Sequence, residues 1–600
     1  TEKTTNSRLF NKGILPVAVA TAMFGAGAAS AFSITTDATI DNQTGGNSTT
    51  NYLVHDNVTL STNSSMSVYY GTLNGVQTNG NTAGAGMVVV GGNLTVHGNV
   101  GGSVGLGNFT ISEWNSLTLA SNVSTFNSDN MTLSDNTVLN FGNVTSGYNR
   151  GSSETLTFAS NITMGSNSTI NVGNGTTLNG NIYGAGTLNV LGNFTSTGSI
   201  GAAQVDGADF ITSKLEQINI SEGNTFTLNT NATATNMDIN GTVTATGNIT
   251  AAVTMGASGV LNLNNGNTWG DNAAKVVGAI DGYDAQQGTL NINGTFTTQG
   301  VIGGTYGLSA INLSNSTFTP GFTTTFAHNV NATTIKIGTN TMQTNATLQI
   351  TAGGTSAGVN IAVTGNIIGG GNATSTDNAA GGIFNVAGNA TVSGNIGSSG
   401  GILAEIQIQD GTTLTILGAS RNIYANNITM RNDSGSDASN ATLAFNGTGT
   451  TTVNGVIAGE TTEGEGLIDI NTGTVSFQNT VGSESNYISG IDIADGSTMT
   501  TSSNIYANST IKVRGTLNID ATGGITIAAN DANGDGGGLQ IGNTSGDNGT
   551  LETAGTITLS SNTTGIDITP TLHSFNNATI KLNGTHSAHA ATGSGYIEIG

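Results

Sequence analysis

The chain has 600 residues, of which 90 are Gly, none is Cys and only 8% are charged. Its formal net charge of -23 arises from 12 basic and 35 acidic residues, and because Lys and Arg form no cluster that could displace counterions from phosphates, the composition excludes a nucleic-acid-binding surface. Aromatic residues are scarce at 5%, and the hydrophobic fraction of 36% is low for a compact globular enzyme. The apolar residues are mostly Val, Ile and Leu in short alternating runs that predict many short strands.

The first 31 residues have the order of a secretory signal peptide. A basic start is followed by an apolar run over 13–28 and then by small residues that end at Ala31. This order predicts export, with cleavage between Ala31 and Phe32. The alternatives are a buried N-terminal helix or a short membrane anchor, but the run is short and rich in Gly and Ala for a bilayer span.

A unit that alternates apolar and polar residues and ends in Gly recurs along the rest of the chain. Four copies and a looser fifth lie at 87–101, 187–201, 289–303, 383–397 and 467–482. Their terminal glycines are 100, 102, 94 and 85 residues apart. Short runs rich in β-branched residues follow each copy, and Gly, Asn, Asp or Ser separates one run from the next, which is typical of strands joined by turns.

A repeat of this length suits either a row of β-sandwich domains or a parallel β-solenoid. Sandwich domains would show recurring Trp or Tyr anchors and linkers, and the copies show neither. In a solenoid, equivalent strands of about 4–6 residues stack from coil to coil, and loops lengthen without disturbing the stack. We therefore predict an all-β parallel β-helix over 32–600, with coils of about 20–25 residues and four or five coils in each long repeat. Asn at turns would form stacked amide ladders.

The glycine-rich stretch GTLNINGTFTTQGVIGG at 288–304 has two interpretations. Glycines at this spacing suit a phosphate-binding loop, but such a loop lies between a strand and a helix and usually carries a Lys. No copy of the repeat is followed by a helical pattern, so we interpret the glycines as turns. The alternation then places three apolar side chains inside and two amides outside, namely Leu290, Ile292 and Phe296, and Asn291 and Asn293.

Two later segments contain residue types that hydrolases use. Asp433-Ser434-Gly435 is similar to the sequence around the nucleophile of chymotrypsin-like proteases, but Asn432 stands where that pattern has Gly, and no recognisable His motif lies upstream. Glu463 and Glu465 form an acidic pair without a basic partner, whereas glycan-cleaving β-helices cluster such groups in a groove. We interpret the first segment as a polar turn and the second as a solvated loop, and we expect no enzymatic activity and no catalytic or cofactor-binding residues.

One partial calcium-binding pattern lies near the C-terminal end. Asp531, Asn533 and Asp535 match the first half of a calcium loop, in which alternating oxygens wrap a hard cation. The twelfth position is Gly542, where a complete loop has a bidentate Glu. The alternative interpretation is a Gly-rich turn.

The third copy of the repeat resembles a known bacterial family. GTLNINGTFTTQGVIGGTYGLSAINL at 288–313, followed by NVNATTIKI at 329–337, is similar to the passenger regions of rickettsial outer-membrane surface antigens and related autotransporters. The resemblance covers most of residues 84–520. It implies a surface-exposed β-helical passenger that a C-terminal β-barrel translocator carries out of the cell, with a role in adhesion to host cells or in a surface coat.

These implications set the functional expectation. The barrel is missing from the chain, which ends within an alternating run at 596–599 and looks truncated there. We expect an exported protein of the outer-membrane surface or the extracellular space, an adhesin associated with virulence, whose extended face binds a receptor on a host cell or a neighbouring cell. The alternative is a structural surface-layer or matrix protein that acts by self-association.

Overall fold

The structure is a computed structural model of the whole chain. It describes residues 32–40, 51–63, 68–76, 84–141, 155–201, 204–206, 209–211, 214–264, 275–314, 322–338, 346–351, 360–370, 380–431, 440–460, 464–521, 525–529, 539–542, 549–554, 557–560, 571–574, 579–582, 587–589 and 596–599. Within these ranges every helix or strand is a β-strand. No helix in them has the length and apolar character that a membrane span requires.

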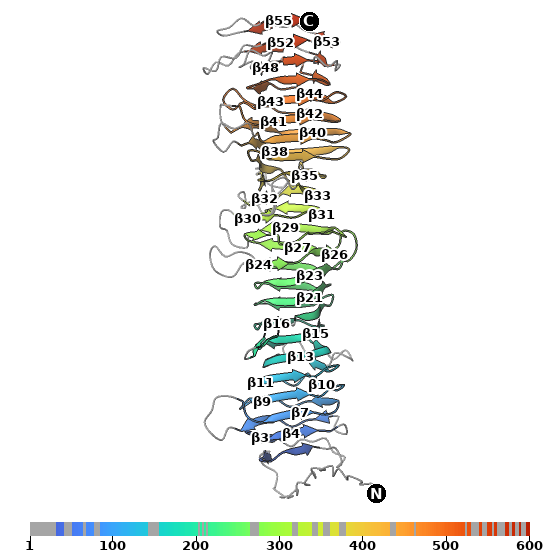
Figure 1. Cartoon of the computed structure of the whole chain (residues 1–600), viewed down its shortest axis with the longest axis vertical. Coiled ribbons are helices and arrows are strands. Elements are labelled where there is room, and N and C mark those ends of the chain that lie inside the picture. Colours follow the sequence, from blue (N-terminus) through green and yellow to red (C-terminus); the bar gives the residue numbers. More distant parts are fainter. Residues whose placement is uncertain are drawn as a thin grey trace, which may run out of the picture. The chain divides into compact units, whose positions relative to one another are not determined.

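The chain forms two compact units, Thr1–Gly186 and Thr187–Gly600. In the first unit, parallel strands from successive turns of the chain lie on one another, and Figure 1 shows β7, β9 and β11 as successive rungs. The bounds of the main strands are β7 Met87–Val90, β8 Leu94–Val96, β9 Leu106–Ile111, β10 Ser116–Leu119, β11 Thr125–Leu133, β12 Val138–Phe141, β13 Leu156–Val172 and β14 Thr176–Leu178. Pairing between coils, always parallel among these strands, is the pattern of a β-helix.

Buried apolar side chains align through this unit in three columns. The columns are Val88, Phe109, Met131 and Ile162; Leu94, Leu117, Leu139 and Ile170; and Leu73, Val100, Phe126, Phe158 and Leu178. Phe126 and Phe158 stack with their ring centroids 4.5 Å apart. Each fully buried side chain of this size contributes about 1.5–3 kcal/mol through removal from water, so the columns are the main source of stability.

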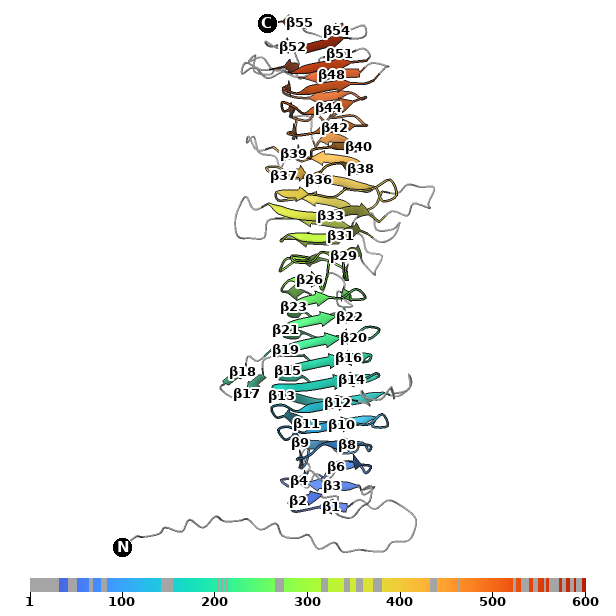
Figure 2. The same ribbon diagram turned by 90° about the vertical axis from the view of Figure 1, so that its right-hand side faces the viewer.

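The second unit repeats the same three-column plan, and Figure 2 shows β19, β21 and β23 as rungs beside β20 and β22. The bounds of the strands used below are β19 Leu215–Ile220, β20 Thr225–Leu228, β21 Ala232–Ile239, β22 Thr242–Ala245, β23 Ile249–Met255, β24 Val260–Asn264, β26 Ile280–Gly282, β27 Thr289–Asn293, β28 Phe296–Thr297, β29 Leu308–Ser314, β30 Thr323–Phe326, β31 Val330–Ile337, β32 Thr347–Ile350, β33 Ile361–Gly369, β34 Ile383–Val386, β36 Leu403–Ile408, β38 Arg421–Met430, β40 Thr450–Gly459, β41 Leu467–Ile470, β43 Gly490–Ile493 and β46 Ile511–Val513. The predicted all-β parallel β-helix is confirmed.

The stretch 288–304 supplies one residue to each column of this unit. Leu290 belongs to the first, Phe296 to the second and Ile302 to the third, so fifteen residues, 289–303, turn two corners of a coil. The columns are Phe226, Val243, Leu261, Leu290, Ile311, Ile335, Ile367, Ile396, Ile423 and Val453; Phe296, Thr324, Leu348, Phe384, Ile406, Ile428 and Ile457; and Ile218, Met237, Val253, Ile280, Ile302, Val330, Val363, Val392, Ile416, Phe445 and Ile470.

The predicted sides of this stretch are confirmed. Leu290, Ile292 and Phe296 are buried, while Asn291 and Asn293 face outward. The alternation works because successive side chains of a strand point to opposite faces of the sheet.

The glycine that ends each repeat is confirmed as a turn residue. At Gly101, Gly201, Gly303, Gly397 and Gly482, φ lies between 63° and 75°. A Cβ at these positions would lie 1.9 to 2.2 Å from a carbonyl oxygen of the next coil. Only glycine combines a left-handed backbone with so close an approach, so the glycines are explained by coil geometry rather than by a phosphate ligand.

The expected coil length of about 20–25 residues holds for some coils and not for others, since Leu290 and Ile311 are 21 residues apart and Ile311 and Ile335 are 24 apart. Hydrogen-bonded side chains in successive coils are 18 residues apart for Thr244 and Asn262 but 36 apart for Gln349 and Asn385. Between the glycines at 303 and 397 the third column advances only from Ile302 through Val330 and Val363 to Val392. That repeat therefore holds about three coils rather than four or five. The preceding repeat, between the glycines at 201 and 303, holds the expected four, because the first column runs there through Phe226, Val243, Leu261 and Leu290. The connections between strands vary in length while the strand register is kept.

Candidate functional site

The outward faces of the coils carry rows of hydrogen-bonded amides. In the second unit, Asn312 Nδ2 donates to Asn291 Oδ1 at 2.8 Å, and Asn291 Nδ2 donates to Asn262 Oδ1 at 2.7 Å. In the first unit, Asn171 Nδ2 donates to Asn140 Oδ1 at 2.8 Å. Amide ladders are therefore present as predicted, but they lie on the strands and not at the turns where the prediction placed them. They produce uncharged rows in which each coil continues the polar row of the last.

A second set of amides bridges the coils at their corners. The side-chain oxygens of Asn248, Asn329, Asn389 and Asn395 each accept a backbone N–H of the next coil at 2.9 Å. These contacts satisfy polar backbone groups where the sheets end, as buried and half-buried amide groups require. Sequence reasoning assigned turn Asn to left-handed geometry and missed this bridging role, although Gly-Asn pairs marked three of the four positions.

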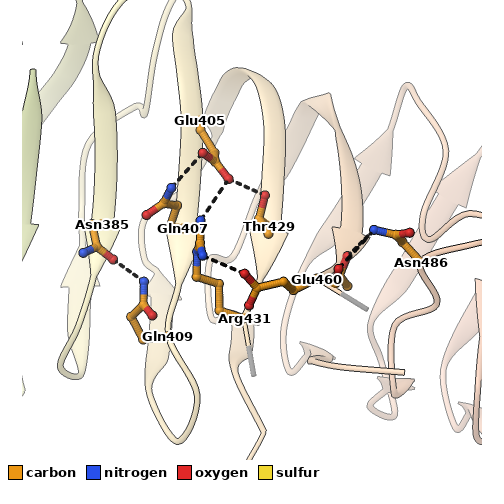
Figure 3. Close-up of polar contacts among 9 residues, drawn as sticks. Asn385, Glu405, Gln407, Gln409, Thr429, Arg431, Glu460 and Asn486 are labelled. Carbon is orange, nitrogen blue, oxygen red and sulfur yellow. Dashed lines mark hydrogen bonds and ion pairs between the residues drawn. The ribbon is translucent and has the colours of Figure 1, made fainter. Parts of the chain in front are cut away.

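A charged cluster crosses β36, β38 and β40 in the second unit. Arg431 lies between two carboxylates, with Nη1 2.7 Å from Glu460 Oε1 and Nη2 4.0 Å from Glu405 Oε1 (Figure 3). Glu405 also accepts hydrogen bonds from Gln407 Nε2 at 2.7 Å and from Thr429 Oγ1 at 2.5 Å. Gln407 and Thr429 lie on the same outward face as Glu405. The cluster therefore links side chains from three successive coils.

The same face continues this polar network on both sides. Gln409 Nε2 donates to Asn385 Oδ1 at 2.7 Å, and Asn486 Nδ2 donates to the Gly459 carbonyl at 3.0 Å (Figure 3). The side chains of Arg431 and Glu460 are 31% and 35% exposed, so water screens their ion pair and it contributes less than about 1 kcal/mol to stability.

A second group of charges lies on β41, β43 and β46. Asp469 and Asp492 are register partners on adjacent strands, and Arg514 Nη2 lies 2.7 Å from Asp492 Oδ1. Burial raises the pKa of Asp469, the neighbouring charge of Asp492 raises it further, and Arg514 opposes both. Sequence reasoning missed this pair, yet the matching segments LIDI and GIDI would have revealed it once they were stacked in register.

Burial also raises the pKa of Asp238 on β21, and hydrogen bonds from Gln217 and Thr254 oppose that effect. Asp238 belongs to an outward row with Asn219 on β19 and Thr254 on β23. The row continues to Asp281 on β26, so it holds two carboxyl groups, and that of Asp238 is accommodated by the same kind of contact between coils as the amides.

Most of the site residues predicted from the sequence fall outside the described residues. Asp531, Asn533 and Asp535 of the calcium pattern lie outside them, as do Asp433-Ser434-Gly435 and Ala31. Phe32 is the first residue of β1, Phe32–Ile34. Among the residues that the structure does describe, no group of three or more His, Cys, Asp or Glu side chains is placed to hold a metal ion.

The solvated-loop interpretation is wrong for Glu465. Its side chain is only 3% exposed, and its backbone N–H donates to the Tyr487 carbonyl at 3.2 Å. Glu463 lies outside the described residues. The Gly-rich segment around Glu465 reads as a loop in the sequence, but the next coil covers it, and only the stacking of coils reveals that.

Exposed aromatic side chains stand out from the polar faces. Trp114 in the first unit is 73% exposed and has φ of 64°, at a turn position where Asn136 in the next coil has φ of 56°. Tyr283 and Tyr306 in the second unit are 75% and 44% exposed. Sequence reasoning missed all three, although each lies between the alternating runs rather than within them.

The chain was compared with known proteins at three levels, and no protein-family model, curated protein or solved structure matches it.

Proposed function

We propose that the chain is an exported bacterial cell-surface passenger that acts as an adhesin through the outward faces of its β-helix. The observation that supports this most directly is the continuity of the polar faces, on which hydrogen-bonded amides such as Asn262, Asn291 and Asn312 follow one another from coil to coil. Such a face repeats similar groups at the spacing between strands of about 4.8 Å, so a partner surface contacts many weak sites at once.

The placement of aromatic side chains adds to this support. The large apolar residues are mostly buried in the three columns, yet Trp114, Tyr283 and Tyr306 project from turns. Tyr and Trp are enriched in protein interfaces, because they provide a large contact area with one polar end. The signal-peptide pattern of 1–31 and the resemblance to autotransporter passengers point to the cell surface as the place where these groups act.

The test is to compare adhesion with self-assembly, using the purified full chain. We expect saturable binding of the fluorescently labelled chain to cultured host cells, with unlabelled chain as competitor. Electron microscopy and analytical ultracentrifugation of the same sample, without cells, then report any ordered assembly. Ordered sheets or filaments without cell binding would contradict the adhesin and favour a surface-layer or matrix protein.

A further inference from the structure

Tyr283 and Tyr306 belong to adjacent coils at one corner of the second unit. Tyr283 follows β26 and Tyr306 precedes β29, and the Ile280–Ile302 bridge joins the two coils at this corner. The backbone N–H of Gly282 donates to the Tyr306 carbonyl at 3.0 Å. The two exposed aromatic side chains therefore project from neighbouring turns of the β-helix.

Hydrogen bonds hold both turns in place. Tyr283 N–H donates to the Met255 carbonyl at 2.8 Å, and Gln286 N–H donates to the Gly307 carbonyl at 2.8 Å. Thr305 N–H donates to Asp281 Oδ1 at 3.1 Å. A partner that docks here meets side chains on an ordered backbone, so little additional ordering opposes binding.

The protein's own packing leaves much of both tyrosines uncovered, with Tyr283 75% and Tyr306 44% exposed. Tyr70, another exposed aromatic residue, stacks on His97 at 4.4 Å. No ring in the described part of the chain makes such a contact with Tyr283 or Tyr306. The exposed part of each ring lies outside the core and can contact another molecule.

Two carboxylates belong to the same turns. Asp281 faces outward on β26, and Asp284 follows Tyr283, where it accepts the Ala285 N–H at 2.7 Å. No ion pair involves either carboxylate within the described residues. In the two turns, 280–287 and 302–307, these are the two charged residues, so the turns carry negative charge; the nearest Lys residues in the sequence are Lys275 and Lys336.

We propose that Tyr283, Tyr306, Asp281 and Asp284 form a docking site for an Arg- or Lys-bearing segment of a partner protein. A cationic side chain over a tyrosine ring is attracted by the negative face of the ring, and the carboxylates add charge-assisted hydrogen bonds. This site rests on the proposed adhesin function, for which it names the partner's chemistry. The net charge of -23 favours the approach of a basic segment over an acidic one.

The test measures fluorescence polarisation of short labelled peptides with the full chain. The peptides alternate Gly with Arg, Lys, Glu or Ser. The Arg and Lys peptides should bind, more weakly as the salt concentration rises, and the Glu and Ser peptides should not. Replacing both tyrosines, Tyr283→Ser with Tyr306→Ser, should weaken Arg-peptide binding about 5- to 30-fold.

Matched variants separate the parts of the site. Tyr283→Phe with Tyr306→Phe should keep binding, because the rings remain, whereas Asp281→Asn with Asp284→Asn should weaken it and flatten its salt dependence. Trp114→Ser, which removes an exposed ring from the first unit, should leave binding unchanged. Circular dichroism of each variant confirms that the β-helix is intact.

Several outcomes would overturn the site. These are unchanged Arg-peptide affinity in the double Ser variant, equal binding of the Glu peptide, or no Arg-peptide binding together with Tyr-dependent binding of a neutral oligosaccharide such as cellohexaose. Host-cell binding of the same variants separates this proposal from the adhesin. If Arg peptides bind in a Tyr-dependent way but the chain does not adhere to cells, the docking site stands and the adhesin proposal is refuted. If the double Ser variant adheres normally and its peptide binding is unchanged, the adhesin proposal stands and the docking site is refuted.

Discussion

Individual residues of the columns differ in how well their polar atoms are accommodated. Thr324 stands in the second column of the second unit between Phe296 and Leu348, is fully buried, and has a hydroxyl oxygen without a hydrogen-bond partner. The half-buried carboxyl of Asp469, by contrast, lies near Arg514. An unpaired buried polar group costs about 1–3 kcal/mol of folding free energy. Substitutions at Thr324 and Asp469 should therefore change the stability of their coils measurably.

Replacing Thr324 with Val should stabilise its coil by about 1 kcal/mol or more, because valine has nearly the same volume and lacks the unpaired hydroxyl. Native-state hydrogen exchange of amides in β30 and β32 would report this as slower local opening. Thr325→Val is the matched control, since Thr325 points outward from the same strand. Faster exchange in Thr324→Val would show that the hydroxyl has a partner.

The raised pKa of Asp469 predicts a pH dependence with an unusual sign. A carboxyl whose pKa is higher in the folded than in the unfolded state takes up protons on folding, so its contribution becomes less favourable as the pH rises through the folded pKa. The burial penalty is therefore fully present above that pKa and is lost as the pH falls through it. Asp469→Asn should remove this dependence.

Hydrogen exchange of β41 and β43, corrected for intrinsic rates at each pH, measures the effect. Asp469→Asn should slow local opening at neutral pH and make little difference in acid. Asp495→Asn, in an exposed turn of the same coil as Asp492, is the control and should not change the pH profile. An equal effect of Asp469→Asn at both pH values would contradict a titrating carboxyl as the cause.

At the scale of elements, strands and turns have separate requirements. Strands need an apolar residue at every second position, and many substitutions satisfy that. The closing turn of each repeat needs glycine, because the backbone is left-handed and a neighbouring carbonyl occupies the place of a Cβ. At some corners the chain stays extended instead, and a register shift between Asn331 and Thr334 lets β31 contribute to two columns.

Gly303→Ala should destabilise its coil by more than about 2 kcal/mol, since the added Cβ would lie 2.2 Å from the Asn331 carbonyl oxygen and φ is 68°. Gly304→Ala is a matched control one residue away, where the nearest atom would be Val301 Cγ1 at 3.1 Å. Limited proteolysis and hydrogen exchange of β26 and β29 would compare the two. Equal behaviour of both variants would show that the turn is not constrained.

At the scale of whole units, each coil contacts mainly the coils before and after it. Stability of such a solenoid is approximately a sum of coil terms and nearest-neighbour interfaces. Ile302, Val330 and Val363 occupy equivalent places in successive coils of the second unit. The polar ladders on the outside follow the same register, so the surface that a partner meets is as periodic as the core.

Deleting residues 303–330 should therefore remove one coil and leave the β-helix folded. Ile302 and Val330 occupy equivalent places in successive coils, so Asn331 would follow Ile302 in the deletion as it follows Val330 now. Deletion of 303–316 is the control, since it joins non-equivalent positions and puts an outward residue into a column. Far-UV circular dichroism and protease resistance would distinguish the two. Loss of the β spectrum in the whole-coil deletion would contradict the assigned register.

The candidate functional surface was only partly predictable. Amide ladders were predicted from the abundance of Asn, but at turns; they lie on strands, because stacking equivalent strands brings like side chains together. The Asp469–Asp492 pair and the Glu405–Arg431–Glu460 cluster were not, because their members are 23 to 29 residues apart and the distance that joins them varies with each connection. The corner with Tyr283 and Tyr306 could not be predicted either, because the sequence does not show which tyrosines are exposed in the folded chain.

The sequence by itself determined the fold class, the inward and outward sides of the strands and the turn role of the repeat glycines. These are local properties, since alternation and glycine geometry act over a few residues. Only the tertiary structure decided the coil length, the burial of Glu465 and which charged and aromatic side chains share a face. Those depend on the register between coils, and strand pairing sets that register over connections whose lengths no local pattern predicts.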